Sequence, residues 1–373
     1  DLYLNEEKGT TAGESVESES TTEAVEADYN APVAIDQTFL HTPTRARLQV
    51  LVGLLRSFFP TSTSSQNCRV IVFFSCCDAV DFHFALFRAA AANKLIPAFL
   101  PARVKVLRLH GNLEQSNRVS TFNEFIKEGK AVSGTTAEPI QTILFCTDVA
   151  ARGLDFPNLA GSVQYDAPCD IHDYIHRAGR TGRLSTSTTA GILSKKAKSV
   201  LFLMPSEEAY VQRLITMGMK SLRKESFDEY LKWVDKLDSK KLQSILASKK
   251  VKRNKSVDEE STTGDANEEP ILAHLPTTLK SRMNLLQKVI EIGIADDLEL
   301  AANARNGFLS SCRAYATHPS AEKDIFHIKR LHLGHLAAAY GLDREPKKML
   351  EGHAAAAAAA ANKLHRTTRE QQI

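Results

Sequence analysis

Three features that would assign a protein to a large class are missing from this sequence. The six cysteines form no CxxC pair and have no regular spacing, which argues against a zinc ribbon or a disulfide framework. No run is apolar and long enough to cross a bilayer, and no signal-peptide pattern is visible, so we expect no membrane partner. A phosphate-binding loop of the form GxxxxGKS or GxxxxGKT is also absent. We therefore expect a soluble intracellular fragment of a longer protein, with reduced thiols.

Charge is distributed unevenly along the chain. The formal net charge is +3, but residues 1–30 carry −8, which leaves +11 for the remainder. The acidic opening is rich in Ser, Thr and Glu and poor in large apolar residues, so we expect residues 1–33 to be disordered. The basic remainder suits a nucleic-acid partner.

Short apolar runs alternate with segments of helical periodicity from residue 34 to residue 220. Continuous apolar runs are typical of the central strands of a parallel sheet, because such strands are buried on both faces. The alternation predicts an α/β lobe in which helices flank a parallel sheet. The main expected strands are Arg69–Phe74, Val104–Gly111, Thr142–Cys146, Ser162–Tyr165 and Ser199–Pro205.

Polar residues gather where two of these strands end, which is where open parallel sheets bind their ligands. Three arginines at positions 177, 180 and 183 cannot all be buried without partners. Guanidinium groups clamp phosphate oxygens, so we expect a polyanion; the alternative is a solvated helix face. The residues that follow the two strands are Thr147, Asp148, Arg152, Gly153 and Asp155, then His176, Arg177, Gly179, Arg180, Gly182 and Arg183.

The segments TDVAARGLD and HRAGRTGR, in this order and each after a predicted strand, resemble motifs V and VI of the DEAD-box RNA helicases. The resemblance implies an α/β fold with a RecA-like parallel sheet flanked by helices, followed by a mainly α-helical C-terminal domain. The later sequence LSSCRAYATHPSAEKDIFHIKRLHLGHLAAAYGL resembles the C-terminal extension of the nucleolar members that assemble the large ribosomal subunit.

The motifs DEAD and SAT are absent together with the phosphate-binding loop. In this family all three belong to a preceding RecA-like lobe, which binds ATP and Mg²⁺. The resemblance therefore implies that this chain is the second half of an ATPase and is inactive alone. It also implies that Arg180 and Arg183 reach the γ-phosphate, that Asp155 accepts from the ribose hydroxyl, and that His176 couples the cleft to the other lobe.

The RNA site is implied in the same way. By resemblance, Ser75, Gly111, Arg118 and Thr147 would hold RNA phosphates, so recognition would be directed at the backbone and not at the bases. Ser75 taken alone could equally be a helix cap. Arg152 could serve either the RNA or the interface between the two lobes.

Beyond the lobe, the composition changes twice. Residues 221–270 are expected to form a basic helical extension and linker, which could track RNA or simply be solvated. We expect residues 271–350 to form a helical domain and residues 351–373 an Ala-rich tail. His327, His332 and His335 match no common zinc pattern, so we expect no metal site of the protein's own.

The sequence thus favours the C-terminal half of an ATP-dependent RNA helicase of large ribosomal subunit assembly. Its expected partners are pre-ribosomal RNA, the N-terminal lobe of the same protein and pre-60S assembly factors, in the nucleus and nucleolus. A non-catalytic docking factor on the pre-ribosome is the main alternative. A DNA helicase or remodelling motor fits less well, because the two motifs have the RNA-helicase form.

Overall fold

The structure is a computed structural model of the 373-residue chain. It describes residues 35–59, 67–92, 96–127, 141–148, 152–156, 159–181, 197–219, 221–237, 240, 242–247 and 272–342. The predictions for residues 1–33, for residues 351–373 and for most of the linker before residue 272 lie outside these ranges. None of the helices in the described ranges has the length and apolar character needed to cross a membrane.

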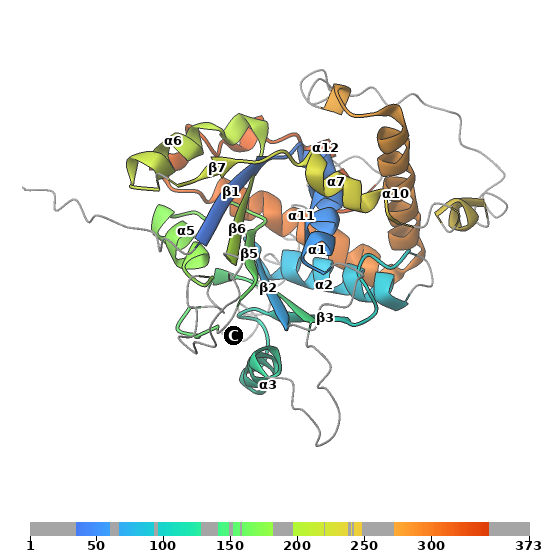
Figure 1. Cartoon of the computed structure of the whole chain (residues 1–373), viewed down its shortest axis with the longest axis horizontal. Helices are drawn as coiled ribbons and strands as arrows, with labels where there is room; N and C mark the ends of the chain where they lie inside the picture. The colour runs from blue at the N-terminus through green and yellow to red at the C-terminus, as the bar shows by residue number, and fades with distance from the viewer. Residues whose placement is uncertain are drawn as a thin grey trace, which may run out of the picture.

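A parallel sheet forms the centre of the molecule, as expected from the apolar runs (Figure 1). In the described ranges it has seven strands in the order β3-β4-β2-β5-β6-β1-β7, and all the pairings are parallel. The strands are β1 (Ile35–His41), β2 (Cys68–Phe73), β3 (Val104–Leu109), β4 (Gln141–Cys146), β5 (Gly161–Gln164), β6 (Ala197–Leu203) and β7 (Arg223–Lys224).

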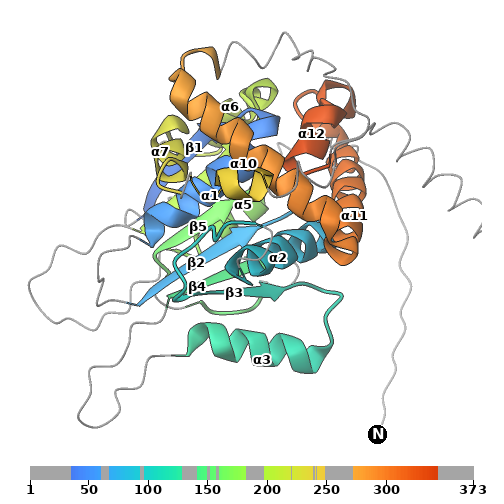
Figure 2. The same ribbon diagram turned by 90° about the vertical axis from the view of Figure 1, so that its right-hand side faces the viewer.

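Helices cover both faces of the sheet. Figure 2 shows α3 beneath the β3–β4 part of the sheet, with α1, α2 and α10 over the other face. The lobe helices are α1 (Arg47–Phe58), α2 (Cys77–Ala92), α3 (Gln115–Ile126), α5 (Ile171–Ala178), α6 (Ala209–Thr216) and α7 (Asp228–Val234). The extension has α10 (Thr277–Asp296), α11 (Leu298–Ala316) and α12 (Leu333–Ala339). Short 3-10 turns are formed by Thr44–Ala46, Pro205–Glu207, Ser320–Glu322 and Ile328–Arg330.

Alternation along the strands explains why helices are needed on both faces. Val70 and Val72 of β2 point into the core beneath α1 and α2, whereas Ile71 and Phe73 point into the smaller core beneath α3. Both sets are apolar, so each face of the sheet must be covered.

The helices of the extension pack directly on the lobe. α11 lies along α2, and both contribute to the same hydrophobic core as α1 and β2. Gln49 of α1 donates to Gln287 of α10 at 3.0 Å inside this contact. The extension is therefore continuous with the lobe's core, while the predicted domain limits at residues 33, 220, 270 and 350 remain predictions.

Candidate functional site

Four strand ends meet at one edge of the sheet. The parallel register pairs Phe73 with Cys146 and with Gln164, and pairs Cys146 with Leu109, so β2, β3, β4 and β5 end at the same level. The segments that follow these strands carry most of the predicted site residues. The topology therefore brings together residues that are far apart in the sequence, as an open parallel sheet does at its carboxyl edge.

Arg177 is the most firmly held side chain at this edge. It is 3% exposed, and its Nε and Nη2 donate to the two carboxylate oxygens of Asp148 at 2.6 and 2.5 Å. Its Nη1 donates to the carbonyl of Asp166 at 2.6 Å, and its guanidinium lies 5.3 Å from the centre of the Phe73 ring. Burial alone would lower the pKa of Arg177, but the Asp148 carboxylate offsets this and the pKa is raised.

This pairing corrects one expectation. We expected a polyanion as the partner of the arginine group, but Arg177 uses a carboxylate of the chain itself. The bidentate pair joins the segment after β4 to helix α5, so that motifs V and VI are held together from within the lobe. The expectation of a polyanion partner therefore remains a prediction for Arg180 and Arg183.

Arg180 differs from Arg177 because α5 ends at Ala178, with Gly179 as its C-cap. Arg180 follows in a turn, is half-buried, and donates from Nη1 to the carbonyl of Leu154 at 2.6 Å. The alternative, a solvated helix face that carries all three arginines, is therefore wrong for Arg180. Arg183 lies outside the described residues.

His176 and Asp155 are both exposed at this edge. His176 lies on α5, directly before the buried Arg177 in the sequence. Asp155 directly follows Leu154, whose carbonyl accepts the hydrogen bond from Arg180. Each of the two residues that we expect to act at the nucleotide is therefore the sequence neighbour of a residue with a fixed contact, His176 of Arg177 and Asp155 of Leu154. Their roles remain predictions.

Arg152 already has a partner within the chain. Its side chain is 62% exposed and donates from Nη2 to Asp173 of α5 at 2.7 Å. The hydrogen bond that Arg152 donates to the Asp173 carboxylate raises the pKa of Arg152. Gly153 beside it has a φ of 75°, a left-handed conformation that favours glycine. The segment is therefore tied to α5 twice, by an exposed pair and by the buried Arg177 pair.

The four predicted RNA-contacting residues lie on three neighbouring strand ends and the adjacent helix. Thr147 is 7% exposed and its backbone N–H donates to the Leu109 carbonyl at 3.3 Å. Gly111 faces open space, since a Cβ there would meet nothing within 4 Å. Arg118 is half-buried on α3, and Phe125 anchors this helix to the core beneath it.

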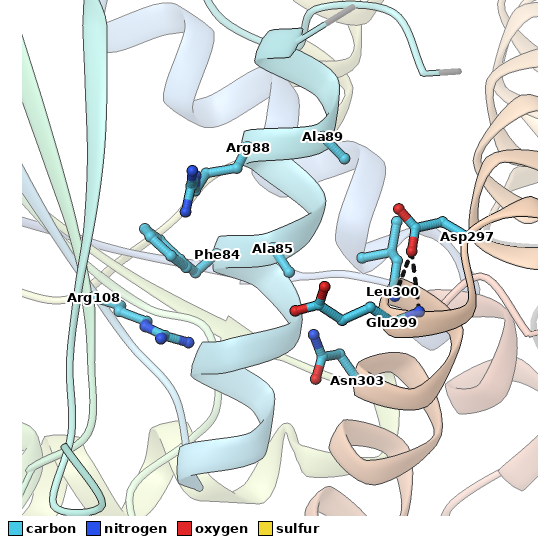
Figure 3. A pocket seen from close by; sticks show the side chains of 9 residues that line it. All are labelled: Phe84, Ala85, Arg88, Ala89, Arg108, Asp297, Glu299, Leu300 and Asn303. Carbon is cyan, nitrogen blue, oxygen red and sulfur yellow. Dashed lines mark hydrogen bonds between the residues drawn. The ribbon is translucent and has the colours of Figure 1, made fainter. Parts of the chain in front are cut away.

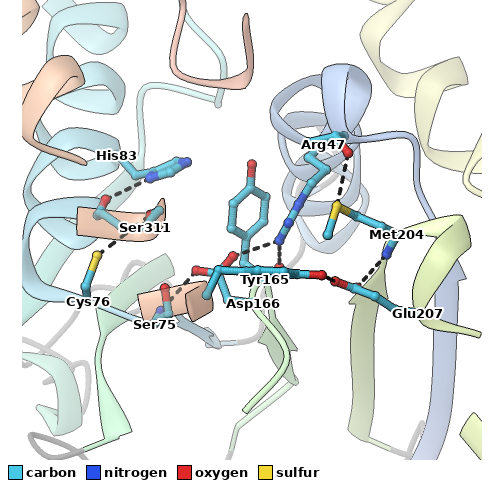
Figure 4. Close-up of polar contacts among 12 residues, drawn as sticks. Arg47, Ser75, Cys76, His83, Tyr165, Asp166, Met204, Glu207 and Ser311 are labelled. Carbon is cyan, nitrogen blue, oxygen red and sulfur yellow. Dashed lines mark hydrogen bonds and ion pairs between the residues drawn. The ribbon is translucent and has the colours of Figure 1, made fainter. Parts of the chain in front are cut away.

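Ser75 is held by a residue that sequence reasoning missed. Its backbone N–H donates to Oδ2 of Asp166 at 3.0 Å, and Arg47 donates from Nη2 to Oδ1 of the same carboxylate at 2.8 Å (Figure 4). Arg47 is 8% exposed, also donates to the Tyr165 carbonyl, and lies 4.5 Å from the centre of the Tyr165 ring. A charged residue inside an apolar helical pattern was the signal that could have indicated this role.

A second missed group joins the lobe to the extension. Glu207 is 3% exposed, and its carboxylate accepts from the Met204 backbone N–H at 2.8 Å and from the Tyr315 hydroxyl of α11 at 2.8 Å. Burial raises the pKa of Glu207 to about 6. A small cavity of about 30 Å³ lies beside it, lined also by Ser75 and Arg47.

A larger cavity, of about 350 Å³, lies between α2 and the start of α11 (Figure 3). The ring of Phe84 has the guanidinium of Arg108 at 4.8 Å and that of Arg88 at 5.5 Å. Glu299 and Asn303 line the opposite wall. None of the predicted site residues that the structure describes lines this cavity, so the geometry of the predicted site rests on the carboxyl edge of the sheet instead.

Two family descriptions match the chain. Residues 46–185 match the helicase conserved C-terminal domain, and residues 297–348 match the C-terminal extension of proteins similar to the ATP-dependent rRNA helicase SPB4. The first covers the sheet edge described above, and the second covers α11 and α12.

Relatives are similar over most of the chain. The ATP-dependent RNA helicase DBP7 of Saccharomyces cerevisiae is 34% identical over 348 residues, 86% of this chain and 43% of that protein. DBP7 of Scheffersomyces stipitis is 33% identical over 344 residues, 86% of this chain and 42% of that protein. The chain therefore spans less than half the length of these relatives. Among solved structures, Mss116p DEAD-box helicase domain 2 bound to an RNA duplex has a TM-score of 0.47 and 20% identity, covering 82% of this chain and 85% of that one.

Proposed function

Because the chain belongs to the DEAD-box RNA helicases and has an SPB4-like C-terminal extension, we propose that it is the C-terminal half of an ATP-dependent RNA helicase acting in large ribosomal subunit assembly. The observation that carries the proposal is the buried pair of Arg177 with Asp148. It fixes motifs V and VI against each other at the edge where a parallel sheet binds ligands. Such rigid support is what a site for charged phosphates requires.

The nucleotide side of the proposal concerns the segment after α5. Arg180 is anchored through one guanidinium nitrogen to the Leu154 carbonyl. In the proposed mechanism Arg180, together with Arg183, stabilises the charge that develops on the γ-phosphate, a contribution of about 10³ to 10⁵ in rate. Asp155 accepts a hydrogen bond from the ribose, and His176 couples the cleft to the other lobe. The donor set fits half of a nucleotide site, because the chain has guanidinium and carboxylate groups but no phosphate-binding loop.

ATP would supply the phosphoryl group that is transferred to water, and Mg²⁺, held mainly by the preceding lobe, would offset phosphate charge. The residues of this chain would orient the nucleotide and neutralise the charge of its phosphates. Arg177 keeps Asp148 and α5 in register, so the turn with Arg180 is presented from a fixed base. Without the preceding lobe, hydrolysis is not expected.

The RNA side uses the neighbouring strand ends. Ser75, Gly111, Arg118 and Thr147 would contact phosphates, with the open space at Gly111 allowing close approach of the strand. Contacts to phosphates fix the strand without reading its bases. Arg152, which is exposed although paired with Asp173, would serve either this strand or the interface with the other lobe.

The biological setting follows from the relatives. The description of the SPB4-like extension names an rRNA helicase, which supports pre-ribosomal RNA as the substrate. We propose pre-60S factors and the N-terminal lobe as partners, and the nucleolus as the location. A non-catalytic docking factor is the alternative. It would use the RNA-facing residues and would have no use for Arg180 at the nucleotide cleft.

The test compares Arg180→Ala with Arg118→Ala in the protein reconstituted with a DEAD-box N-terminal lobe. We expect Arg180→Ala to lower ATP turnover by about 10³-fold or more and to leave RNA binding unchanged. Arg118→Ala should weaken RNA binding for every RNA sequence. It should also reduce by about one the slope of the logarithm of RNA affinity against the logarithm of salt concentration. Equal loss of both activities in Arg180→Ala would show that Arg180 belongs to an RNA patch.

A further inference from the structure

The turn that follows β2 and the start of α2, together residues 75–78, are held from the extension by two hydroxyl groups. Ser310 of α11 donates from Oγ to Oδ2 of Asp78. Ser311, next to it, places its Oγ 3.7 Å from the Sγ of Cys76, a distance compatible with a hydrogen bond involving sulfur. Both contacts cross more than two hundred residues of sequence. The turn that carries Ser75 is therefore in direct contact with the extension.

The packing of α11 at this point is unusually close. A Cβ on Gly307 would lie 3.2 Å from the Asp78 carbonyl oxygen and 2.7 Å from Cε1 of Tyr340. The Tyr340 hydroxyl is 2.5 Å from Oγ of Ser311, the residue that contacts Cys76. Glycine at position 307 thus lets the helix backbone approach α2, and Tyr340 fixes the hydroxyl that faces the turn.

The lobe holds the same turn at Ser75. Asp166 accepts from the Ser75 backbone N–H at 3.0 Å and is itself fixed by Arg47 at 2.8 Å. The segment 75–78 is therefore fixed both by a carboxylate of the lobe and by two hydroxyl groups of the extension. Such fixed contacts keep a binding residue near its productive geometry.

We propose that the extension positions the Ser75 turn for RNA, with Ser310 as the positioning residue that acts through Asp78. The inference rests on the proposed function, in which Ser75 contacts an RNA phosphate. Ser310 itself does not touch the RNA. It makes the affinity of the lobe for RNA depend on the packing of α11 against α2.

The test measures binding of a fluorescein-labelled single-stranded oligouridylate to the 373-residue chain by anisotropy, at a temperature where every variant is fully folded. We expect Ser310→Ala to weaken binding about 3- to 30-fold, the range seen when a coupling residue is removed. Ser310→Thr, which keeps the hydroxyl, should restore it. Thr317→Ala is the matched control, because the Thr317 hydroxyl bonds only locally to the Ala314 carbonyl at 2.7 Å.

A double-mutant cycle separates positioning from a general effect on the fold. In a Ser75→Ala background, Ser310→Ala should have little further effect if it acts through the turn. Additive losses, or an equal loss in Thr317→Ala, would overturn the inference. Unchanged affinity in Ser310→Ala with weakened binding in Arg118→Ala would overturn it too, yet leave the proposed function standing. Unchanged affinity in both Arg118→Ala and Ser75→Ala would contradict the proposed function itself.

Discussion

Replacing Arg177 by methionine should destabilise the lobe far more than the loss of an ordinary ion pair. The guanidinium is 3% exposed and makes two hydrogen bonds to Asp148 and one to the Asp166 carbonyl. Removing one partner of a buried pair leaves the other charge without compensation, which costs about 3 to 5 kcal/mol. Asp148 keeps 23% of its side chain exposed, so water offsets part of this cost and we expect the lower end of the range.

The measurement is a urea titration of the chain followed by circular dichroism, which gives the free energy of unfolding. Arg152→Met is the matched control, because Arg152 pairs with Asp173 in the same region but is 62% exposed. Its loss should cost no more than about 1 kcal/mol. The double variant Arg177→Met, Asp148→Leu should recover part of the loss. Equal effects of Arg177→Met and Arg152→Met would refute the reasoning.

Two further predictions concern the contact between the lobe and the extension. The pKa of Glu207 is raised from 4.5 to about 6, so between these pH values the folded state binds a proton that the unfolded state has released. The free energy of unfolding is therefore lost as pH rises from 4.5 through 6. Relative to Glu207→Gln, the unfolding free energy of the wild type should fall by about 2 kcal/mol over this window; parallel pH profiles would contradict it. Gly307→Val should cost about 1 to 3 kcal/mol by overpacking against Tyr340, measured by urea titration. Gly111→Ala, with open space around it, should leave stability unchanged, and equal losses would rule out overpacking.

The sequence predicted the elements better than it predicted their partners. The apolar runs located β2 to β6 to within about two residues, because strands buried on both faces leave a continuous apolar signal. The short β7 has no such signal, since both its residues, Arg223 and Lys224, are exposed. β1, near the start of the lobe, is a regular strand that pairs with both β6 and β7.

Side-chain partners were harder to predict because they depend on strand order. The need for a partner at Arg177 could be predicted, but Asp148 is 29 residues away and meets it only once β4 and α5 are assembled. Arg47 and Asp166 are 119 residues apart. Local periodicity carries no information on such pairs. α5 ends at Ala178, before Arg180, and its C-cap is Gly179. Glycine often marks a helix C-terminus, so this end could have been predicted from the sequence.

We propose above that this chain contributes half of a nucleotide site. The most direct test is ATP turnover by the chain with and without single-stranded RNA, repeated with a DEAD-box N-terminal lobe supplied in trans. The account predicts no turnover by the chain alone, RNA-stimulated turnover on mixing, and loss of that turnover in Arg180→Ala. Turnover by the chain alone would contradict it, because that result requires a complete nucleotide site within these 373 residues.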